Sequence, residues 1–328
     1  MALDWRPLLD TFEKHQTFTI TSHVRPDADA IGSAVSLAGL LQRMGKLTRI
    51  IMPSEAPKYL HWLDDGDQLL KIGEQVSHAE ALDTNCHIVV DTSAWAQLGD
   101  VGAVLRETQA EKIVVDHHVS SDDLGATEYK DTTASAAGVL IAEIYEAAGI
   151  VPTETQASAM FCAIATDTGW FRFSSVEPRT LKVAARLVEQ GATPTKIYKQ
   201  LYERSSMARL KLQARVLDRI ELACDGRIAY SWVLRSDIED VKAQPADTEG
   251  FVNQLLSLEG VDAAFLMVEQ HDGRAKFSLR SQPGTIVSPV AESFGGGGHK
   301  QACGVMMDGP AIEARDRLLA KLTEHLVG

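Results

Sequence analysis

The segment Lys112-Ile113-Val114-Val115-Asp116-His117-His118 decides the expected fold. Its short run of β-branched residues is typical of a buried parallel strand, and it ends in one carboxylate and two imidazoles. Open α/β sheets bind their ligands at the carboxyl ends of such strands. Alone, the string is also compatible with a surface turn or a buried histidine. Because neighbouring side chains of a strand point to opposite faces, we expect only one of the two histidines to reach a given site.

A second polar group follows the predicted first strand, residues 18–23. His23, Asp27 and Asp29 lie within seven residues, in a loop where Pro26 disfavours helical backbone and from which the next helix starts. A helix N-cap accounts for one aspartate. A histidine with two aspartates exceeds that need and indicates a metal site.

Two further regular elements end in an aspartate. The strand predicted from residue 87 closes on Asp91, and the Ala-rich helix predicted over 153–165 is followed by Asp167. The helix macrodipole disfavours a carboxylate at a helix C-terminus, so Asp167 has no evident structural role there. A solvated loop acid is the ordinary alternative.

Strands and helices alternate up to about residue 195, which predicts a doubly wound α/β domain with a parallel sheet. Beyond it, strands are predicted at 227–234, 263–269 and 274–280, with a hairpin turn at Asp272-Gly273. We therefore expect three parts: a metal-binding domain over residues 1–195, a helical linker over 196–215, and a smaller mixed-sheet α+β domain over 216–328.

The unusual stretch of the second domain is Gly295-Gly296-Gly297-Gly298-His299. Consecutive glycines let backbone amides approach an anion closely, as in phosphate-binding loops, and a flexible linker is the alternative. Arg280 ends a predicted strand, and Ser281 follows it. The guanidinium fork suits a phosphate, although a lone arginine at a strand end is more often a surface charge.

Composition excludes several classes of protein. The 328 residues carry a net charge of −13, so no global positive field attracts long nucleic acids. The four cysteines are scattered without a CxxC pair, which indicates reduced thiols. The first residues lack the features of a signal peptide, and no apolar stretch approaches the roughly 18 residues of a membrane span. We expect a cytoplasmic protein without a membrane partner.

The polar groups at the strand ends and turns exceed what one metal ion needs. They are His23, Asp27, Asp29, Asp91, His117, His118 and Asp167. Mixed nitrogen and oxygen ligands without thiolate favour Mn²⁺, with Mg²⁺, Co²⁺ or Fe²⁺ as alternatives. Two such ions about 3.5–4 Å apart, sharing one carboxylate, can clamp a phosphoryl group for in-line attack.

The ordered motifs His-x-Arg-Pro-Asp-Ala-Asp, Asp91, Asp-His-His, Asp167 and Gly-Gly-Gly-His resemble those of the DHH phosphoesterase superfamily, in the branch that carries a DHHA1 domain. The resemblance covers nearly the whole chain. The compact two-domain layout is similar to bacterial nanoRNases of the NrnA type. It implies a phosphoesterase with two Mn²⁺ ions that degrades short RNA oligonucleotides and removes the 3′-phosphate of pAp, with a homodimer as an option.

The resemblance also implies roles for the matching residues of the first domain. The first ion would be bound by His23, Asp27 and Asp91. The second would be bound by Asp29, Asp91, His117 and Asp167. In the catalytic set, His118 would contact the scissile phosphate and assist the leaving group, and Asp116 would fix the local geometry.

In the second domain, the resemblance implies residues that hold the substrate's other phosphate and its terminal nucleotide. They are Arg280, Ser281, Gly296, Gly297, Gly298 and His299. His299 also belongs to the implied catalytic set.

Four other functions stay open. A phosphodiesterase for pApA, cyclic di-AMP or pGpG would have the same layout. A RecJ-like single-strand exonuclease is disfavoured by the acidic charge, and a family II pyrophosphatase by the Gly-Gly-Gly-His motif. A nucleotide-sensing protein without turnover is disfavoured by the intact ligand set. Base preference, cleavage polarity and the main substrate do not follow from the sequence.

Overall fold

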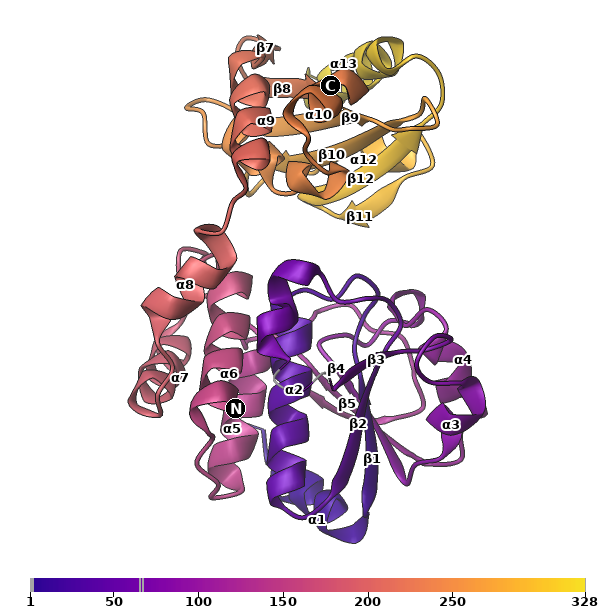
Figure 1. The fold of residues 1–328 in the computed structure, drawn as a ribbon, viewed down its shortest axis with the longest axis vertical. Helices are drawn as coiled ribbons and strands as arrows, with labels where there is room; N and C mark the ends of the chain where they lie inside the picture. The colour runs from indigo at the N-terminus through magenta and orange to yellow at the C-terminus, as the bar shows by residue number, and fades with distance from the viewer. Residues whose placement is uncertain (1–2, 65, 67, 328) are drawn as a thin grey trace. The chain divides into compact units, whose positions relative to one another are not determined.

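The chain forms two compact units in the computed structural model, which describes residues 3–64, 66 and 68–327. The first unit comprises Met1–Arg204 and the second Ser205–Gly328. Each has its own sheet (Figure 1). Each also has its own hydrophobic cores. Among the described helices, none is long and apolar enough to cross a membrane.

A parallel sheet of six described strands forms the centre of the first unit. The strands are β1 (Thr17–Thr21), β2 (Leu47–Met52), β3 (Leu69–Lys71), β4 (Cys86–Val90), β5 (Glu111–Asp116) and β6 (Thr127–Lys130). Their order is β3-β2-β1-β4-β5-β6, and neighbouring strands are parallel throughout. The direction of strand addition reverses between β1 and β4. Ligands of such sheets bind at this reversal, beyond the carboxyl ends of the strands.

Helices cover both faces of this sheet (Figure 1). On one face lie α2 (Ala28–Arg43), α5 (Ala137–Ala147) and α6 (Glu154–Asp167), and on the other lie α3 (His78–Leu82) and α4 (Val101–Glu107). Side chains alternate between the two faces along β4. Val90 therefore lies in the core under α2, α5 and α6, and Val89 lies in the core under α3 and α4. Burial on both faces explains why β4 and β5 are continuous apolar runs.

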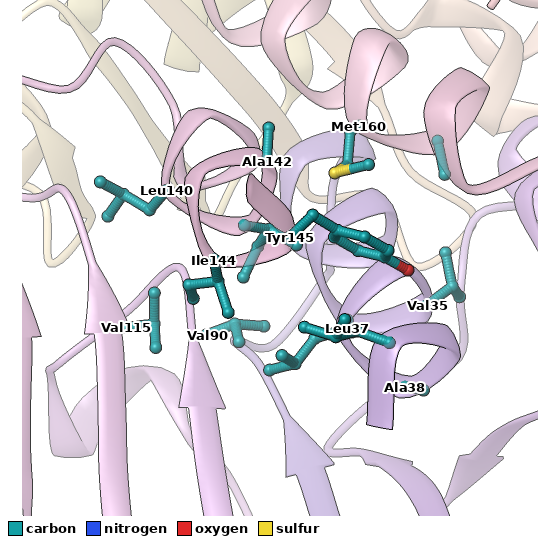
Figure 2. Close-up of a cluster of buried hydrophobic side chains, with 14 of the residues drawn as sticks. Val35, Leu37, Ala38, Val90, Val115, Leu140, Ala142, Ile144, Tyr145 and Met160 are labelled. Carbon is teal, nitrogen blue, oxygen red and sulfur yellow. The ribbon is translucent and has the colours of Figure 1, made fainter. Parts of the chain in front are cut away.

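The core under α2 and α5 is closely packed. Figure 2 shows Val90 and Val115 of the sheet near Ile144 and Tyr145 of α5. The buried Tyr145 hydroxyl donates a hydrogen bond of 2.7 Å to the carbonyl of Ser36. The polar tip of the tyrosine therefore keeps a partner inside an apolar core.

Helices α2 and α6 approach each other closely because of one glycine. A Cβ added to Gly32 would lie 2.5 Å from the carbonyl oxygen of Ala159, a distance that no real Cβ tolerates. The remaining helices of the unit are α1 (Arg6–Lys14), η1 (Lys58–Leu63), η2 (Trp95–Gln97), α7 (Pro178–Glu189) and α8 (Pro194–Tyr202).

The second unit contains a mixed sheet of six described strands in the order β11-β12-β10-β9-β8-β7. The strands are β7 (Glu221–Ala223), β8 (Ile228–Val233), β9 (Ala263–Glu269), β10 (Ala275–Ser281), β11 (Gly297–His299) and β12 (Ala302–Met307). Strands β8 and β9 are parallel, and the other pairs are antiparallel. The helices are α9 (Met207–Asp218), α10 (Arg235–Val241), η3 (Pro245–Thr248), α11 (Phe251–Leu255), α12 (Ser288–Glu292) and α13 (Ala311–Val327).

The predicted fold class is confirmed, because a parallel-sheet α/β domain precedes a mixed-sheet α+β domain. The prediction of a glycine loop is wrong for the second half of the run: Gly295 lies in a turn, but Gly297–His299 forms the edge strand β11, paired with β12. A Cβ on Gly298 would lie 2.6 Å from the carbonyl oxygen of Ala302, so this glycine permits a close strand approach. The linker over 196–215 stays a prediction. It spans most of α8 and most of α9, and the division between the units falls within it.

A row of polar and charged residues crosses four strands of the sheet in the first unit. Arg49, Thr19, His87 and Lys112 are aligned across four neighbouring strands. His87 is fully buried, and neither of its ring nitrogens has a hydrogen-bond partner among the described residues. Burial, together with the charges of Arg49 and Lys112, lowers the pKa of His87 to about 4. The folded protein therefore holds this histidine neutral.

Replacing His87 by leucine is expected to remove an acid-sensitive part of the stability. A histidine titrates near 6.5 in the unfolded chain and at about 4 here, so the unfolded state binds more protons between these values. The contribution of the neutral His87 to the free energy of unfolding is fully present above a pH of about 6.5. It is lost as the pH falls toward 4, by up to roughly 3 kcal/mol. Urea unfolding with a chelator, at neutral and at acidic pH, should show a smaller acid loss for His87→Leu than for the wild type.

His78→Leu is the matched control, because it changes an exposed histidine on α3. Equal acid losses for the wild type and His87→Leu would show that His87 is not the source.

Candidate metal centre

The first group of ligands gathers where β1 leads into α2. The Nε2 atom of His23 lies 3.4 Å from Oδ2 of Asp91 and 3.8 Å from Oδ1 of Asp27. Its Nδ1 atom lies 3.0 Å from the carbonyl oxygen of Val24, and a carbonyl only accepts, so Nδ1 is the donor. Asp27 is also the N-cap of α2, where it accepts from the backbone N–H groups of the next turn. His23 thus directs Nε2 toward the two carboxylates.

The second group gathers around His117, which follows β5. Its Nε2 atom lies 3.3 Å from Oδ1 of Asp91, 3.6 Å from Oδ2 of Asp167 and 3.7 Å from Oδ2 of Asp29. Its Nδ1 donates to the carbonyl of Ala134 at 3.2 Å. The structure therefore brings together residues that follow β4 and β5 with residues from α2 and the C-terminus of α6.

Asp91 lies between the two groups and belongs to both. Its two carboxylate oxygens face His23 and His117 respectively. The residue is buried and has a left-handed backbone with a φ of 61°. A non-glycine residue in that conformation is strained, and such strain is concentrated at functional sites.

Two buried polar atoms indicate whether metal ions fit these groups. Oδ1 of Asp91 and Nε2 of His117 are buried, and neither has a hydrogen-bond partner among the described residues. Uncompensated buried polar atoms are costly, and a cation between them would satisfy both. The donors around each group are imidazole nitrogens and carboxylate oxygens within 4.8 Å of one another. The residues fit a divalent ion with mixed nitrogen and oxygen ligands.

The carboxylates of the centre raise the proton affinity of several of its members, although not of Asp27, whose pKa is lowered against the effect of burial by its contact with His23. Burial opposes protonation of His23, but Asp27 and Asp91 outweigh it and raise its pKa to about 11. Burial and the neighbouring carboxylates Asp91 and Asp167 raise the pKa of Asp29 well above its usual value. Burial likewise raises the pKa of Asp167. Without a metal, protons therefore supply the positive charge that this centre requires, and a metal ion must displace them.

Sequence reasoning missed the groups that hold Asp29. Its Oδ1 accepts from the N–H of Gly138 at 2.8 Å and from the hydroxyl of Ser33 at 3.1 Å. Its Oδ2 accepts from the N–H of Ala137 at 2.7 Å, at the start of α5. A helix N-terminus is a natural partner for a carboxylate.

His118 differs from the expectation based on strand alternation. That expectation is wrong because β5 ends at Asp116, so both histidines follow the strand, and their ring centroids lie 4.5 Å apart. Nδ1 of His118 lies 2.8 Å from Oδ1 of Asp116 and 3.8 Å from Oδ1 of Asp91. The hydrogen bond with Asp116 raises the pKa of His118, although burial opposes this.

The predicted substrate residues of the second unit lie around the end of β10. Nη1 of Arg280 donates to the carbonyl of Leu279 at 2.9 Å. The hydroxyl of the buried Ser281 donates to the carbonyl of Thr285 at 2.7 Å, so its hydrogen is already used. The side chain of His299 lies outside the described part of the structure. The substrate roles of these residues and of Gly296, Gly297 and Gly298 stay predictions.

Family models match both units. The DHH family, N-terminal domain, matches residues 17–165. The DHHA1 domain matches residues 225–328. All of the candidate metal ligands except Asp167 lie within the first match.

Three similar proteins span nearly the whole of this chain. The bifunctional oligoribonuclease and PAP phosphatase NrnA of Bacillus subtilis is 27% identical over 96% of each chain. The cyclic-di-AMP phosphodiesterase PdeA of Listeria monocytogenes is 24% identical over 94% of this chain and 48% of its own length. The crystal structure of an exopolyphosphatase-related protein of Bacteroides fragilis superposes with a TM-score of 0.91, at 24% identity, over 98% of this chain and 97% of that one. The last likeness establishes the fold.

Asp91→Asn is expected to weaken binding of both metal ions and to abolish turnover. One carboxylate faces both ligand groups, and asparagine keeps its size and tolerates the left-handed backbone. Metal content by atomic emission after gel filtration checks this, with the surface change Asp100→Asn as control. Two ions still bound, with a near-normal rate, would contradict the shared position of Asp91.

Proposed function

We propose, from the premise that this chain belongs to the DHH family and carries a DHHA1 domain, that it is a two-metal phosphodiesterase. It hydrolyses short oligoribonucleotides to mononucleotides and removes the 3′-phosphate of pAp. The observation that carries the proposal is Asp91, whose oxygens lie 3.4 Å from Nε2 of His23 and 3.3 Å from Nε2 of His117. Similarity over nearly the whole chain to an enzyme named for both activities supports the substrate class.

The proposed ligands divide into two sets that share Asp91. One ion would be held by His23, Asp27 and Asp91, and the other by Asp29, Asp91, His117 and Asp167. We infer Mn²⁺, with Mg²⁺, Co²⁺ or Fe²⁺ as alternatives, because the donors are imidazole and carboxylate without thiolate. When bound, the ions supply a nucleophile at neutral pH and neutralise the charge that develops on the phosphate.

His118 is proposed as the general acid. Asp116 accepts the hydrogen bonds of its backbone N–H at 3.1 Å and of its Nδ1 at 2.8 Å, which fixes the ring. The opposite ring nitrogen, Nε2, is then the atom that can give a proton to the leaving oxygen. The raised pKa of His118 favours the protonated ring that this task needs.

The second unit is proposed to bind the part of the substrate beyond the scissile phosphate. Arg280 is half-buried, and no carboxylate lies within ion-pair distance of its guanidinium among the described residues. Its pKa is lowered by burial, which reflects the cost of holding this charge away from water. A phosphate bound by its planar fork would compensate for that cost.

A substrate panel with Mn²⁺ tests the function. It comprises pAp, pApA, a five-residue RNA, a 25-residue RNA, cyclic di-AMP and pyrophosphate, with products separated by chromatography. We expect mononucleotides from pApA and the five-residue RNA, AMP and phosphate from pAp, and rates that fall steeply beyond about five nucleotides, since the acidic chain has no long basic track. Preference for cyclic di-AMP would favour the dinucleotide-signalling alternative, and rapid digestion of the 25-residue RNA the RecJ-like one.

His118→Ala is expected to keep both ions and to lose roughly 10²- to 10⁴-fold in turnover, the usual scale for a general acid. Metal analysis and steady-state kinetics on pApA are the measurements. Loss of one ion from His118→Ala would make His118 a ligand instead, through the third ligand group that it forms with Asp91 and His117.

Arg280→Ala and His299→Ala are expected to keep the metals and the fold but to lower turnover of pApA and pAp by a large factor. Contacts remote from the reacting bond orient the phosphate, so their loss affects turnover as well as affinity. Bis-p-nitrophenyl phosphate has no second phosphate and should lose much less. Equal losses on both substrates would place these residues at the reaction itself.

A further inference from the structure

The edge strand β6 brings a lysine to the carboxylate that holds His118. Lys130 is the last residue of β6 and is aligned with Asp116 of β5 in the parallel register. Aligned residues of neighbouring strands point to the same face of a sheet. The Lys130 side chain is only 13% exposed, and its Nζ lies 3.6 Å from Oδ2 of the fully buried Asp116.

Hydrogen bonds connect this lysine to His118 through two intermediate side chains. Nζ of Lys130 donates to the hydroxyl oxygen of Ser93 at 3.0 Å. The Ser93 hydroxyl donates to Oδ2 of Asp116 at 2.6 Å. The other oxygen, Oδ1, accepts from Nδ1 of His118 at 2.8 Å. Each oxygen of the buried carboxylate therefore has its own partner.

Lys130 also decides which way the Ser93 hydroxyl points. A hydroxyl has one hydrogen, and that of Ser93 has a second acceptor within reach, the carbonyl of Ser120 at 3.3 Å. Lys130 donates to that same carbonyl at 2.9 Å and to the oxygen of Ser93. Both bonds direct the Ser93 hydrogen toward Asp116.

The positive charge of Lys130 also stabilises the Asp116 carboxylate. A buried carboxylate is tolerated only when it is paired and hydrogen-bonded. Within the described residues, Lys130 is the lysine or arginine whose charged group lies within 4 Å of Asp116. Without it, the Asp116 carboxylate would keep its hydrogen bonds with His118 but lose its compensating charge, and the Ser93 hydroxyl could turn to the carbonyl of Ser120 instead.

We propose that Lys130 and Ser93 are positioning residues for the reaction, and this inference rests on the proposed function. Together they fix the rotation of the Asp116 carboxylate. Through it they fix the His118 ring, so that Nε2 is presented to the leaving oxygen. Neither residue touches the substrate or a metal ion.

The test compares two kinds of leaving group. Cleavage of pApA expels an alkoxide that needs a proton, whereas bis-p-nitrophenyl phosphate expels a phenolate that does not. Lys130→Met keeps the length of the side chain and removes its charge. It should lower the kcat for pApA by roughly 10-fold or more, with little change in KM, because small misplacements of a catalytic group are costly. Its effect on the nitrophenyl ester should stay within about 3-fold, well below the scale of general acid catalysis.

A double-mutant cycle shows whether the lysine acts through His118. In the His118→Ala background, Lys130→Met should cause little further loss on pApA, because residues that act as a unit are strongly non-additive. Lys130→Arg should restore part of the rate. Lys112→Met is the matched control, since it removes another half-buried strand lysine of the same sheet, which donates to the carbonyl of Leu105. Metal content and melting temperature are measured for every variant.

Two results would overturn the inference: equal losses on both substrates with the metals retained, or losses that multiply fully with His118→Ala. If Lys130→Met does not fold, Ser93→Ala answers the same question and leaves the ammonium in place. A wild type that cleaves neither pApA nor pAp would refute the proposed function. The comparison would then be made on whichever alkoxide-releasing diester the panel identifies.

Discussion

Repulsion among four carboxylates at one edge of a parallel sheet is the constraint on which the rest of the first unit depends. Asp27, Asp29, Asp91 and Asp167 converge on two imidazoles, and water screens Asp29 and Asp91 little because both are buried. The pKa values of His23 and Asp29 are raised in this centre, because a bound proton reduces the repulsion among the carboxylates. Metal binding in such a centre is an exchange of one kind of cation for another, and it stabilises the fold that assembles the site.

Backbone N–H groups, as well as cations, compensate for the repulsion among these carboxylates. The strand order reverses between β1 and β4, which opens a place where residues from several elements can meet. The N-terminus of α2 binds Asp27, and the first amides of α5 bind Asp29. Two helix N-termini thus direct their partial positive charge at these two carboxylates. The strained backbone at Asp91 then presents both of its oxygens to the centre.

Much of the fold and of the ligand set could be predicted from the sequence, for physical reasons. Long strands buried on both faces are continuous apolar runs, and an acid at the end of such a run has few structural explanations. The strand β6 and the helix α12 are too short for any periodicity to show. Contacts between residues far apart in the sequence could not be predicted either, because Lys130 reaches Asp116 only through the register of two strands. The glycine run misled us, since the composition that suits a loop also suits a strand pressed against its neighbour.

The contact between α2 and α6 bears on the size of ion that the centre admits. Asp27 and Asp29 lie at the start of α2, and Asp167 is the last residue of α6. Gly32 allows these helices to approach to the point where a Cβ would overlap the carbonyl of Ala159. Any side chain at Gly32 must move the helices apart and carry the two sets of carboxylates with them. The spacing of these carboxylates, and with it the fit of any ion that they hold, therefore depends partly on a residue that has no side chain.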